Sequence, residues 1–323
     1  NTGLVLVIWV GAHRVNSGAA QAGDLIAFQT YFTIILGAVM GMNRIITEFT
    51  KALASADRIQ AVMDAPEDLL VQPELPVVQD DQHVVFDKVC FSYNKTEDNV
   101  NNISFTLKQG ETLGIIGPTG AGKSTIVNLI CRFYEPTEGE IHIDGEDYRK
   151  RSQLWLHSSI GYVLQTPHLF SGTIRENIVM GKPDATDEEV IAAAKAAHAH
   201  SFIKRLPMGY DTVITEDGGS LSQGQKQLLC IARLMLCMPP MLILDEATSS
   251  IDTRTEAIVQ KGMDRLMEGR TVFVIAHRLS TVKNSDVIMV LDHGRIIERG
   301  SHQELIAQKG TYYQLYTGVF ELE

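Results

Sequence analysis

Cysteine is scarce in this sequence, and the arrangement of the few cysteines excludes zinc sites and disulfide frameworks. The four cysteines, Cys90, Cys131, Cys230 and Cys237, lie far apart in apolar surroundings, without a CxxC pair or a cysteine–histidine pattern. Zinc sites have closely spaced cysteine or histidine ligands, and disulfide frameworks are typical of small chains with many cysteines. The cysteine content therefore favours a reducing compartment.

Basic residues are also too few for a nucleic-acid-binding protein. Lys and Arg number 28 against 39 Asp and Glu, which gives the 323 residues a formal net charge of -11. Binding to nucleic acid requires a basic surface, so no nucleic-acid partner is expected. The imbalance lies wholly in residues 65–323, because residues 1–64 contain four basic and four acidic residues. An apolar content of 45 % and a length typical of about two domains indicate a folded chain.

Charge is absent from residues 25–43, a run of 19 residues that reads LIAFQTYFTIILGAVMGMN. A helix of this length spans about 28 Å, which is close to the hydrocarbon thickness of a bilayer. We therefore predict a transmembrane helix, in which Gln29, Thr30 and Thr33 face protein or a water-filled path. The alternative is a buried helix in the core of a soluble protein.

A second apolar run, residues 3–12, precedes this segment and is too short to span a bilayer. No basic segment precedes it, so a signal peptide is a poor account of it. We expect the N-terminus to fall inside a transmembrane helix of a longer protein, with residues 15–23 as the turn between two spans. Arg44, Lys51 and Arg58 follow the second span and favour a cytoplasmic location for that end, although Arg14 on the other side weakens the count.

A helical pattern of apolar residues continues from residue 42 to residue 64, as an extension of the second span. Three prolines, Pro66, Pro73 and Pro76, then interrupt the pattern among acidic neighbours. We therefore divide the chain into a membrane part at residues 1–64, a linker at residues 65–80 and a second domain at residues 81–323.

The second domain begins with three short strand patterns, of which the third, TLGIIG, leads directly into a glycine-rich loop. The loop and the helix-like segment after it match the phosphate-loop pattern GxxxxGK[ST]. Its glycines let backbone N–H groups turn toward phosphates, its lysine faces the β and γ phosphates, and its serine offers a hydroxyl to Mg²⁺. The residues are Gly117, Pro118, Thr119, Gly120, Ala121, Gly122, Lys123, Ser124 and Thr125.

Acidic residues follow a second apolar strand, MLILDE, which ends in Asp245 and Glu246. Strands of this kind lie in the middle of parallel sheets, and ligands gather at their carboxyl ends. Asp245 suits coordination of Mg²⁺ through water, and Glu246 suits orientation or deprotonation of an attacking water. The alternative for a single acid is a helix cap or a solvated loop residue. His277 and Gln165 end two further strand patterns and are candidate contacts of the γ-phosphate, or else ordinary surface or core residues.

The segment LSQGQKQLLCIARLM, residues 221–235, precedes LILDEATSSID and carries a family resemblance. With the phosphate loop, these motifs resemble those of ATP-binding-cassette (ABC) transporters. The chain is similar to the C-terminal part of an exporter half-transporter, in which membrane helices precede the nucleotide-binding domain on one polypeptide.

The resemblance implies ATP and Mg²⁺ as cofactors, and it implies a role for each of several further residues. Tyr93 corresponds to the aromatic platform for adenine. Gln165 corresponds to the hinge glutamine that touches Mg²⁺ and senses the membrane domain. The implied catalytic set is Glu246, His277, Gln165 and Lys123. The implied ATP contacts outside the phosphate loop also include Ser222, Gly224, Gln225 and Asp252.

Ser222 and Gly224 also have a physical role of their own. Ser222 suits the N-cap of a helix that begins at Gln223, and Gly224 permits close approach of a ligand. In the family, this helix start faces ATP bound by an opposing cassette; the alternative is that the segment only caps an amphipathic helix. Gln223 stands where glycine is commonest, as in one subunit of some heterodimeric multidrug or lipid-type exporters, so a heterodimer is hypothesised.

The expected fold is an α/β P-loop NTPase domain with an antiparallel β subdomain and a helical subdomain between Gln165 and Leu242, preceded by a truncated all-α transmembrane segment. The expected function is ATP-driven export by an integral protein of the cell membrane, with a cytoplasmic nucleotide-binding domain. Its expected partners are a second half-transporter, membrane lipid and an unidentified cargo. Two alternatives are a soluble ABC-type ATPase that acts as a switch or clamp, and an ATP-dependent phosphotransferase, which leaves LSQGQ unexplained.

Overall fold

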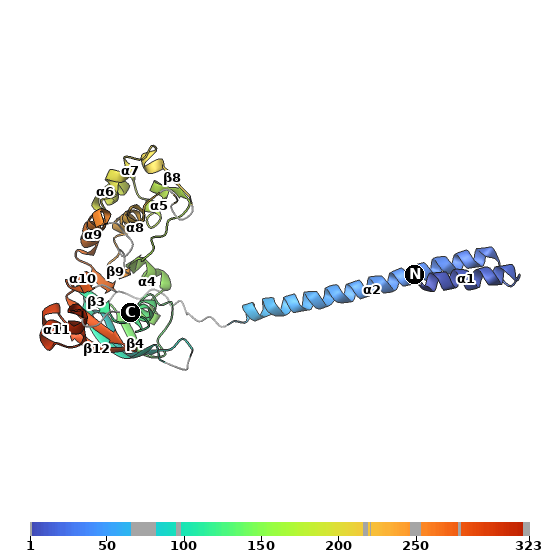
Figure 1. Ribbon diagram of the computed structural model, residues 1–323, viewed down its shortest axis with the longest axis horizontal. Helices are drawn as coiled ribbons and strands as arrows, with labels where there is room; N and C mark the ends of the chain where they lie inside the picture. Colours follow the sequence, from blue (N-terminus) through green and yellow to red (C-terminus); the bar gives the residue numbers. More distant parts are fainter. Residues whose placement is uncertain are drawn as a thin grey trace. The chain divides into compact units, whose positions relative to one another are not determined.

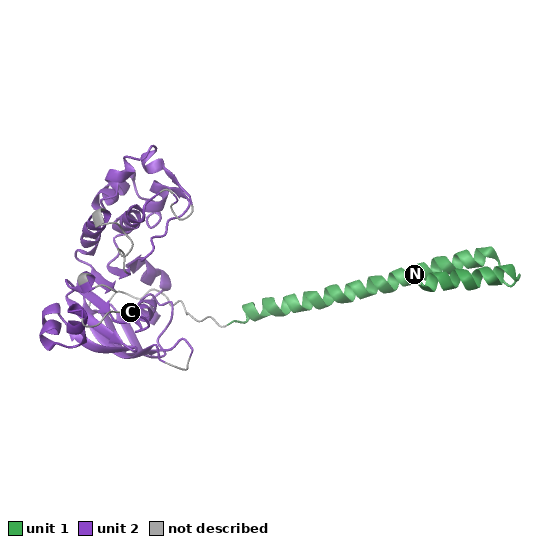
Figure 2. Ribbon diagram, viewed as in Figure 1, with its two compact units in different colours: residues 1–69 green, residues 70–323 purple. Residues whose placement is uncertain are grey.

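The structure, a computed structural model, describes residues 2–65, 82–94, 98–215, 219, 221–245, 253–276 and 279–318. The chain divides into two compact units, residues 1–69 and 70–323 (Figure 2). The predicted linker, residues 65–80, lies outside the described residues except for its first residue. The linker's bounds therefore stay a prediction.

The first unit contains two helices, α1 (Thr2–Asn16) and α2 (Ala22–Met63), and α1 lies along the N-terminal part of α2 (Figure 1). The turn between them covers residues 17–21 and is shorter than the predicted 15–23, because both helices extend into that segment. The predicted span and its predicted extension form one uninterrupted helix of 42 residues. Asp24 closes a capping box with Gln21 at its start.

Helix α2 has the composition and length of a membrane span, and its surface differs from that of a core helix. Its most apolar window of 18 residues has a mean hydropathy of 1.7, and none of that window is buried. A core helix of a soluble protein is mostly buried, so this exposure counts against that alternative. The hydroxyls of Thr30 and Thr33 donate to the carbonyls of Ile26 and Gln29, at 2.8 and 2.9 Å. These two hydroxyl groups thus have acceptors within the helix, and the surroundings of Gln29, Thr30 and Thr33 stay a prediction.

The second unit is built on a six-stranded sheet in the order β12-β11-β3-β10-β9-β6. The strands from β11 to β6 run parallel, and β12 is antiparallel to β11. Alternate side chains of the central strands enter two cores on opposite faces: in β9, Met241 and Ile243 enter one, and Leu242 and Leu244 the other. The strands are β3 (Thr112–Ile116), β6 (Ile160–Val163), β9 (Met241–Asp245), β10 (Thr271–Ile275), β11 (Val287–Asp292) and β12 (Arg295–Gly300).

A four-stranded antiparallel sheet of order β2-β1-β4-β5 confirms the predicted β subdomain. Its strands are β1 (Gln82–Phe91), β2 (Val100–Lys108), β4 (Glu138–Ile143) and β5 (Glu146–Asp147). It shares one apolar core with a face of the six-stranded sheet. His83 of β1 is buried there, with Nδ1 2.5 Å from the Thr271 hydroxyl of β10 and Nε2 3.5 Å from Asp144. The imidazole therefore joins the two sheets.

In the chain, the helical subdomain lies between β6 and β9, where it was predicted. Figure 1 shows α5, α6, α7 and α8 grouped together. Its main helices are α5 (Ile174–Val179), α6 (Asp187–Ala196), α7 (His200–Ile203) and α8 (Gln223–Cys237). Side-chain capping boxes start α5, α6 and α8. The other elements are α3 (Lys123–Ile130), η1 (Tyr148–Lys150), α4 (Gln153–Ser159), β7 (Gly172–Thr173), η2 (Gly209–Asp211), β8 (Val213–Ile214), α9 (Thr253–Met267), α10 (Leu279–Val282), α11 (His302–Gln308) and α12 (Thr311–Tyr316).

Candidate functional site

The loop between β3 and α3 adopts a conformation that its glycines make possible. Gly117 and Gly122 have φ values of 155° and 100°. A Cβ atom at Gly117 would collide with the carbonyl oxygen of Leu291, and one at Gly122 would lie 2.7 Å from that of Asn99. Neither position accepts a larger residue without displacement of the backbone. The two glycines thus fix the path of the loop against its neighbours.

The side chain of Lys123 is confined by the same loop. Lys123 is 5 % exposed, and its ammonium donates to the carbonyl oxygens of Gly117 at 2.6 Å and Pro118 at 3.0 Å. Lys123 opens α3, so its side chain reaches back across the loop to the residues where β3 ends. The positive charge is therefore held at the loop.

The first turn of α3 lacks the side-chain cap that α5, α6 and α8 possess. Its N-cap, Gly122, has a left-handed backbone conformation and supplies no side-chain acceptor. The N–H groups of Ser124 and Thr125 have no acceptor within the helix, since they belong to its first turn. Unsatisfied N–H groups and the positive end of the helix dipole favour an anion. Together with Lys123, this cradle fits the phosphates of a nucleotide, and the exposed Ser124 hydroxyl suits a metal ion beside them.

Asp245 lies at the edge of the sheet where the phosphate loop begins. Strands β3, β10 and β9 are parallel neighbours, so their carboxyl ends face the same way, and about 10 Å separates β3 from β9. Asp245 is partly buried, and its Oδ2 accepts a hydrogen bond from the Tyr162 hydroxyl at 3.2 Å. Burial, and then the charge of Asp245, raise the pKa of Tyr162, so this phenol stays a donor. Tyr162 was not predicted as a site residue, because no local pattern links it to a residue 83 positions away.

Gln165 lies two residues beyond the end of β6, whereas we predicted the strand to end at Gln165 itself. The ladder with β9 stops at the pair of Val163 and Leu244, so the strand ends before Gln165. The side chain of Gln165 is exposed near the same edge of the sheet. Glu246, Asp252 and His277 lie outside the described residues, and their placement stays a prediction.

Tyr93 follows β1 and lies in a group of aromatic rings next to α3. Its ring is perpendicular to those of Phe91 and Tyr134, with centroid distances of 4.8 and 5.0 Å. Tyr93 is 42 % exposed, and its hydroxyl accepts a hydrogen bond from Nδ2 of Asn128 at 3.0 Å. Neither neighbouring ring stacks face to face on Tyr93, which is compatible with stacking of a planar ligand. Asn128 and Tyr134 were not predicted as site residues.

The helix that carries the signature segment begins as predicted. Ser222 is the N-cap of α8; its Oγ accepts from the N–H of Gln225 at 3.3 Å, and its own N–H donates to Gln225 Oε1 at 3.0 Å. The capping role of Ser222 is therefore confirmed. Gly224 is buried in the first turn. The predicted contacts of these residues with a nucleotide of a second cassette stay predictions.

Two side chains of α8 also reach the segment that follows β6. Gln227, which is 1 % exposed, directs Nε2 at the carbonyl oxygen of Leu164 at 3.5 Å. Arg233 donates from Nε to the carbonyl oxygen of Asn177 at 2.8 Å. The signature helix is thus connected to the residues on both sides of the segment that starts with Gln165.

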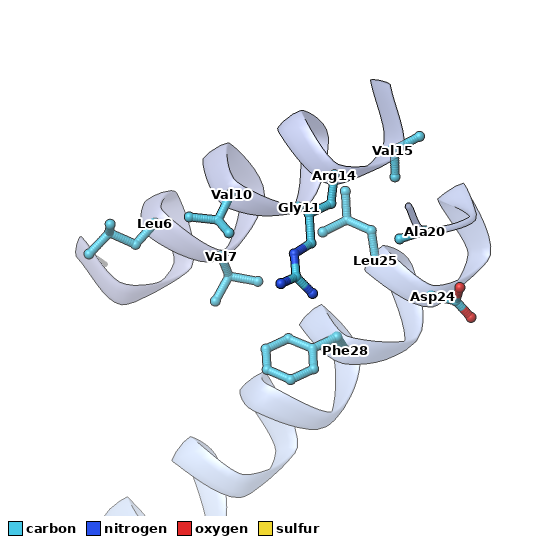
Figure 3. Close-up of a pocket in the computed structure, with 10 residues that line it drawn as sticks. All are labelled: Leu6, Val7, Val10, Gly11, Arg14, Val15, Ala20, Asp24, Leu25 and Phe28. Carbon is cyan, nitrogen blue, oxygen red and sulfur yellow. The ribbon is translucent and has the colours of Figure 1, made fainter. Parts of the chain in front are cut away.

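The first unit has a pocket of its own, with a volume of about 450 Å³ (Figure 3). The guanidinium of Arg14 points into the space between α1 and α2, on the side of Phe28 (Figure 3). Apart from Arg14 and Asp24 the lining is apolar, so it suits an apolar side chain or acyl chain better than a nucleotide. The lining residues are Leu6, Val7, Val10, Gly11, Arg14, Val15, Ala20, Asp24, Leu25 and Phe28.

Comparisons with known proteins point to one family. Residues 100–249 match the model of the family described as ABC transporter. The chain is 44 % identical over 324 residues to the uncharacterized ABC transporter ATP-binding protein YfiC of Bacillus subtilis, covering 99 % of this chain and 53 % of the relative. It is 46 % identical over 319 residues to the fatty acid ABC transporter ATP-binding/permease protein of Mycobacterium bovis, covering 98 % and 50 %.

A solved structure agrees with these relatives. The chain matches a bacterial Atm1-family ABC exporter with ATP bound, with a TM-score of 0.77 and 39 % identity, over 93 % of this chain and 53 % of that one. The chain spans about half the length of the curated relatives that it matches.

Proposed function

The chain belongs to the ABC transporter family and contains its ATP-binding domain, and we propose that it hydrolyses Mg²⁺-bound ATP to drive export across a membrane. The observation that carries this proposal is the phosphate loop, in which Lys123 is held at the loop beside an uncapped helix start. The carboxylate of Asp245 lies at the same edge of the sheet. This combination suits cleavage of a phosphoanhydride and has no use in a purely structural domain.

In this proposal, the phosphate loop and three residues outside it have defined tasks. The backbone of residues 117–125 binds the phosphates, and Lys123 faces the β and γ phosphates. Ser124, Asp245 and Gln165 would hold Mg²⁺, which would neutralise charge on the phosphates. Tyr162 fixes the orientation of the Asp245 carboxylate through its hydrogen bond.

The proposed chemistry is in-line attack of water on the γ-phosphorus. Glu246, which follows β9 in the chain, accepts the proton of that water, and His277 contacts the γ-phosphate. The bond to the β–γ bridging oxygen breaks, and ADP and phosphate leave. The exposed ring of Tyr93 supports its role as the platform for adenine, since every base has a π-face on which an aromatic side chain can stack.

The membrane part is proposed to comprise residues 1–64, followed by a linker at 65–80 and the cassette at 81–323. The unburied apolar surface of α2 supports its location in a bilayer of the cell membrane. Arg44, Lys51 and Arg58 support a cytoplasmic position for the cassette. The names of relatives include a fatty acid transporter, which together with the apolar pocket between α1 and α2 favours an amphiphilic cargo.

A second cassette is proposed to complete the ATP site. Ser222, Gly224, Gln225 and Asp252 would contact the ATP that the phosphate loop of the partner holds. Gln223 in the middle of the signature favours a heterodimer. A purified full-length homodimer with rapid, cargo-stimulated ATPase activity would contradict the heterodimer.

Calorimetric titration of Mg²⁺-ATP into the full-length transporter, with release of phosphate measured in parallel, tests the proposed function. We expect saturable heat and turnover that cargo stimulates. Absence of heat would refute ATP binding. Transfer of the phosphoryl group to an acceptor instead of water would favour a phosphotransferase.

A further inference from the structure

A hydrogen bond connects the aromatic group beside the site to the helix that starts with Lys123. Nδ2 of Asn128 donates to the hydroxyl of Tyr93 at 3.0 Å, although the two residues are 35 positions apart in the chain. Asn128 lies on α3 (Lys123–Ile130), five residues after Lys123, which corresponds to about 7.5 Å along the helix axis. Tyr93 is thus linked to the same rigid element as the phosphate loop.

Aromatic neighbours restrict the ring of Tyr93, and the hydrogen bond from Asn128 fixes the position of its hydroxyl. Phe91 and Tyr134 each meet Tyr93 at an interplanar angle of 90°. Such edge contacts tolerate rotation and sliding better than a polar contact with a fixed donor does. Among the described residues, Asn128 is the hydrogen-bond partner that the structure gives the Tyr93 hydroxyl. The backbone N–H of Tyr93 donates to Asn99 Oδ1 at 3.1 Å, so Asn99 fixes the backbone and Asn128 fixes the hydroxyl end of the ring.

We propose that Asn128 is a positioning residue, which sets the base platform of Tyr93 at a fixed distance from the phosphate loop. The two halves of one nucleotide then meet surfaces that are already correctly spaced, and less free energy is lost to ordering on binding. This inference rests on the proposed binding of ATP at Tyr93 and residues 117–125. A hydrogen bond that served stability alone would leave the selectivity for the base unchanged.

The test compares two ligands of the full-length protein, Mg²⁺-ATP and Mg²⁺-tripolyphosphate, of which the second lacks the base. Asn128→Ala is expected to raise the Kd of ATP about two- to twelve-fold, the factor that one hydrogen bond of ordinary strength supplies, and to leave the Kd of tripolyphosphate unchanged. Tyr93→Phe keeps the ring and removes the hydroxyl, so it is expected to have the same effect. The double variant is expected to bind ATP no more weakly than either single variant, because both remove one interaction.

Gln303→Ala removes an amide from an exposed position of α11 and serves as the matched control, with both Kd values unchanged. Equal losses for ATP and tripolyphosphate would overturn the inference, because they would indicate general damage to the loop. Unchanged ATP binding in both Asn128→Ala and Tyr93→Phe would also overturn it. If the unaltered protein failed to bind Mg²⁺-ATP, the proposed function itself would be refuted, and this inference with it.

Discussion

Replacement of Lys123 by alanine is the most direct perturbation of the phosphate loop. In the free protein the ammonium donates to the carbonyl oxygens of Gly117 and Pro118, which occupies two of its three protons. A charged hydrogen bond contributes about 1.5–3 kcal/mol, so loss of the contact with the phosphates should raise the Kd of ATP about 10- to 150-fold. Because the exchange of loop carbonyls for phosphate oxygens offsets part of this gain, we expect a value in the lower half of that range.

The measurement is a calorimetric titration of Mg²⁺-ATP into the full-length Lys123→Ala protein. Lys195→Ala removes an exposed lysine of α6 and is the matched control, for which the Kd should not change. Thermal unfolding of both variants shows whether the fold is retained. A Kd for Lys123→Ala equal to that of the unaltered protein would refute the reasoning, because the confined ammonium would then make no contact with the nucleotide.

Three further outcomes are expected. Glu246→Gln should retain ATP binding while the rate of phosphate release falls about 10²- to 10⁴-fold, the usual contribution of a general base; normal turnover would remove Glu246 from the chemistry. Tyr162→Phe should raise the Mg²⁺ concentration needed for half-maximal ATPase activity several-fold, because Asp245 loses its hydrogen bond; an unchanged Mg²⁺ dependence would argue against orientation by Tyr162. Burial lowers the pKa of His83 in the folded state, and only the neutral ring accepts a hydrogen bond from the Thr271 hydroxyl. The contribution of His83 to the free energy of unfolding should therefore be complete above pH 6.5, the ordinary pKa of histidine. This contribution should decrease as the pH falls below that value and through the lowered pKa. Urea denaturation at pH 7.5 and 5.5 measures this, and His83→Gln should reduce the difference.

Local patterns predicted the parts of the site that one segment builds alone. The phosphate loop, the N-cap at Ser222 and the helical insertion each depend on residues close together in the chain. Strand β9, which ends in Asp245, was predicted for the same reason, since four consecutive apolar residues before Asp245 indicate burial on both faces of a sheet.

Contacts between distant segments could not be predicted from the sequence. The hydrogen bonds from Tyr162 to Asp245 and from Asn128 to Tyr93 join residues 83 and 35 positions apart, and hydrophobic periodicity contains no information about such pairs. The end of β6 depends likewise on where its pairing with β9 stops. The intrahelical hydrogen bonds of Thr30 and Thr33 were also not predicted, because a hydroxyl that bonds its own helix looks no different in the sequence from one that needs another partner.

The unbroken course of α2 has a mechanical consequence. At 42 residues the helix is about 63 Å long, and its sequence contains no proline that would hinge it. Such a rod acts as a lever arm: a tilt of about 5° at one end displaces the other end by about 5 Å, roughly the pitch of one helical turn. A small rotation at its C-terminal end is thus amplified into a side-chain-sized movement at its N-terminal end.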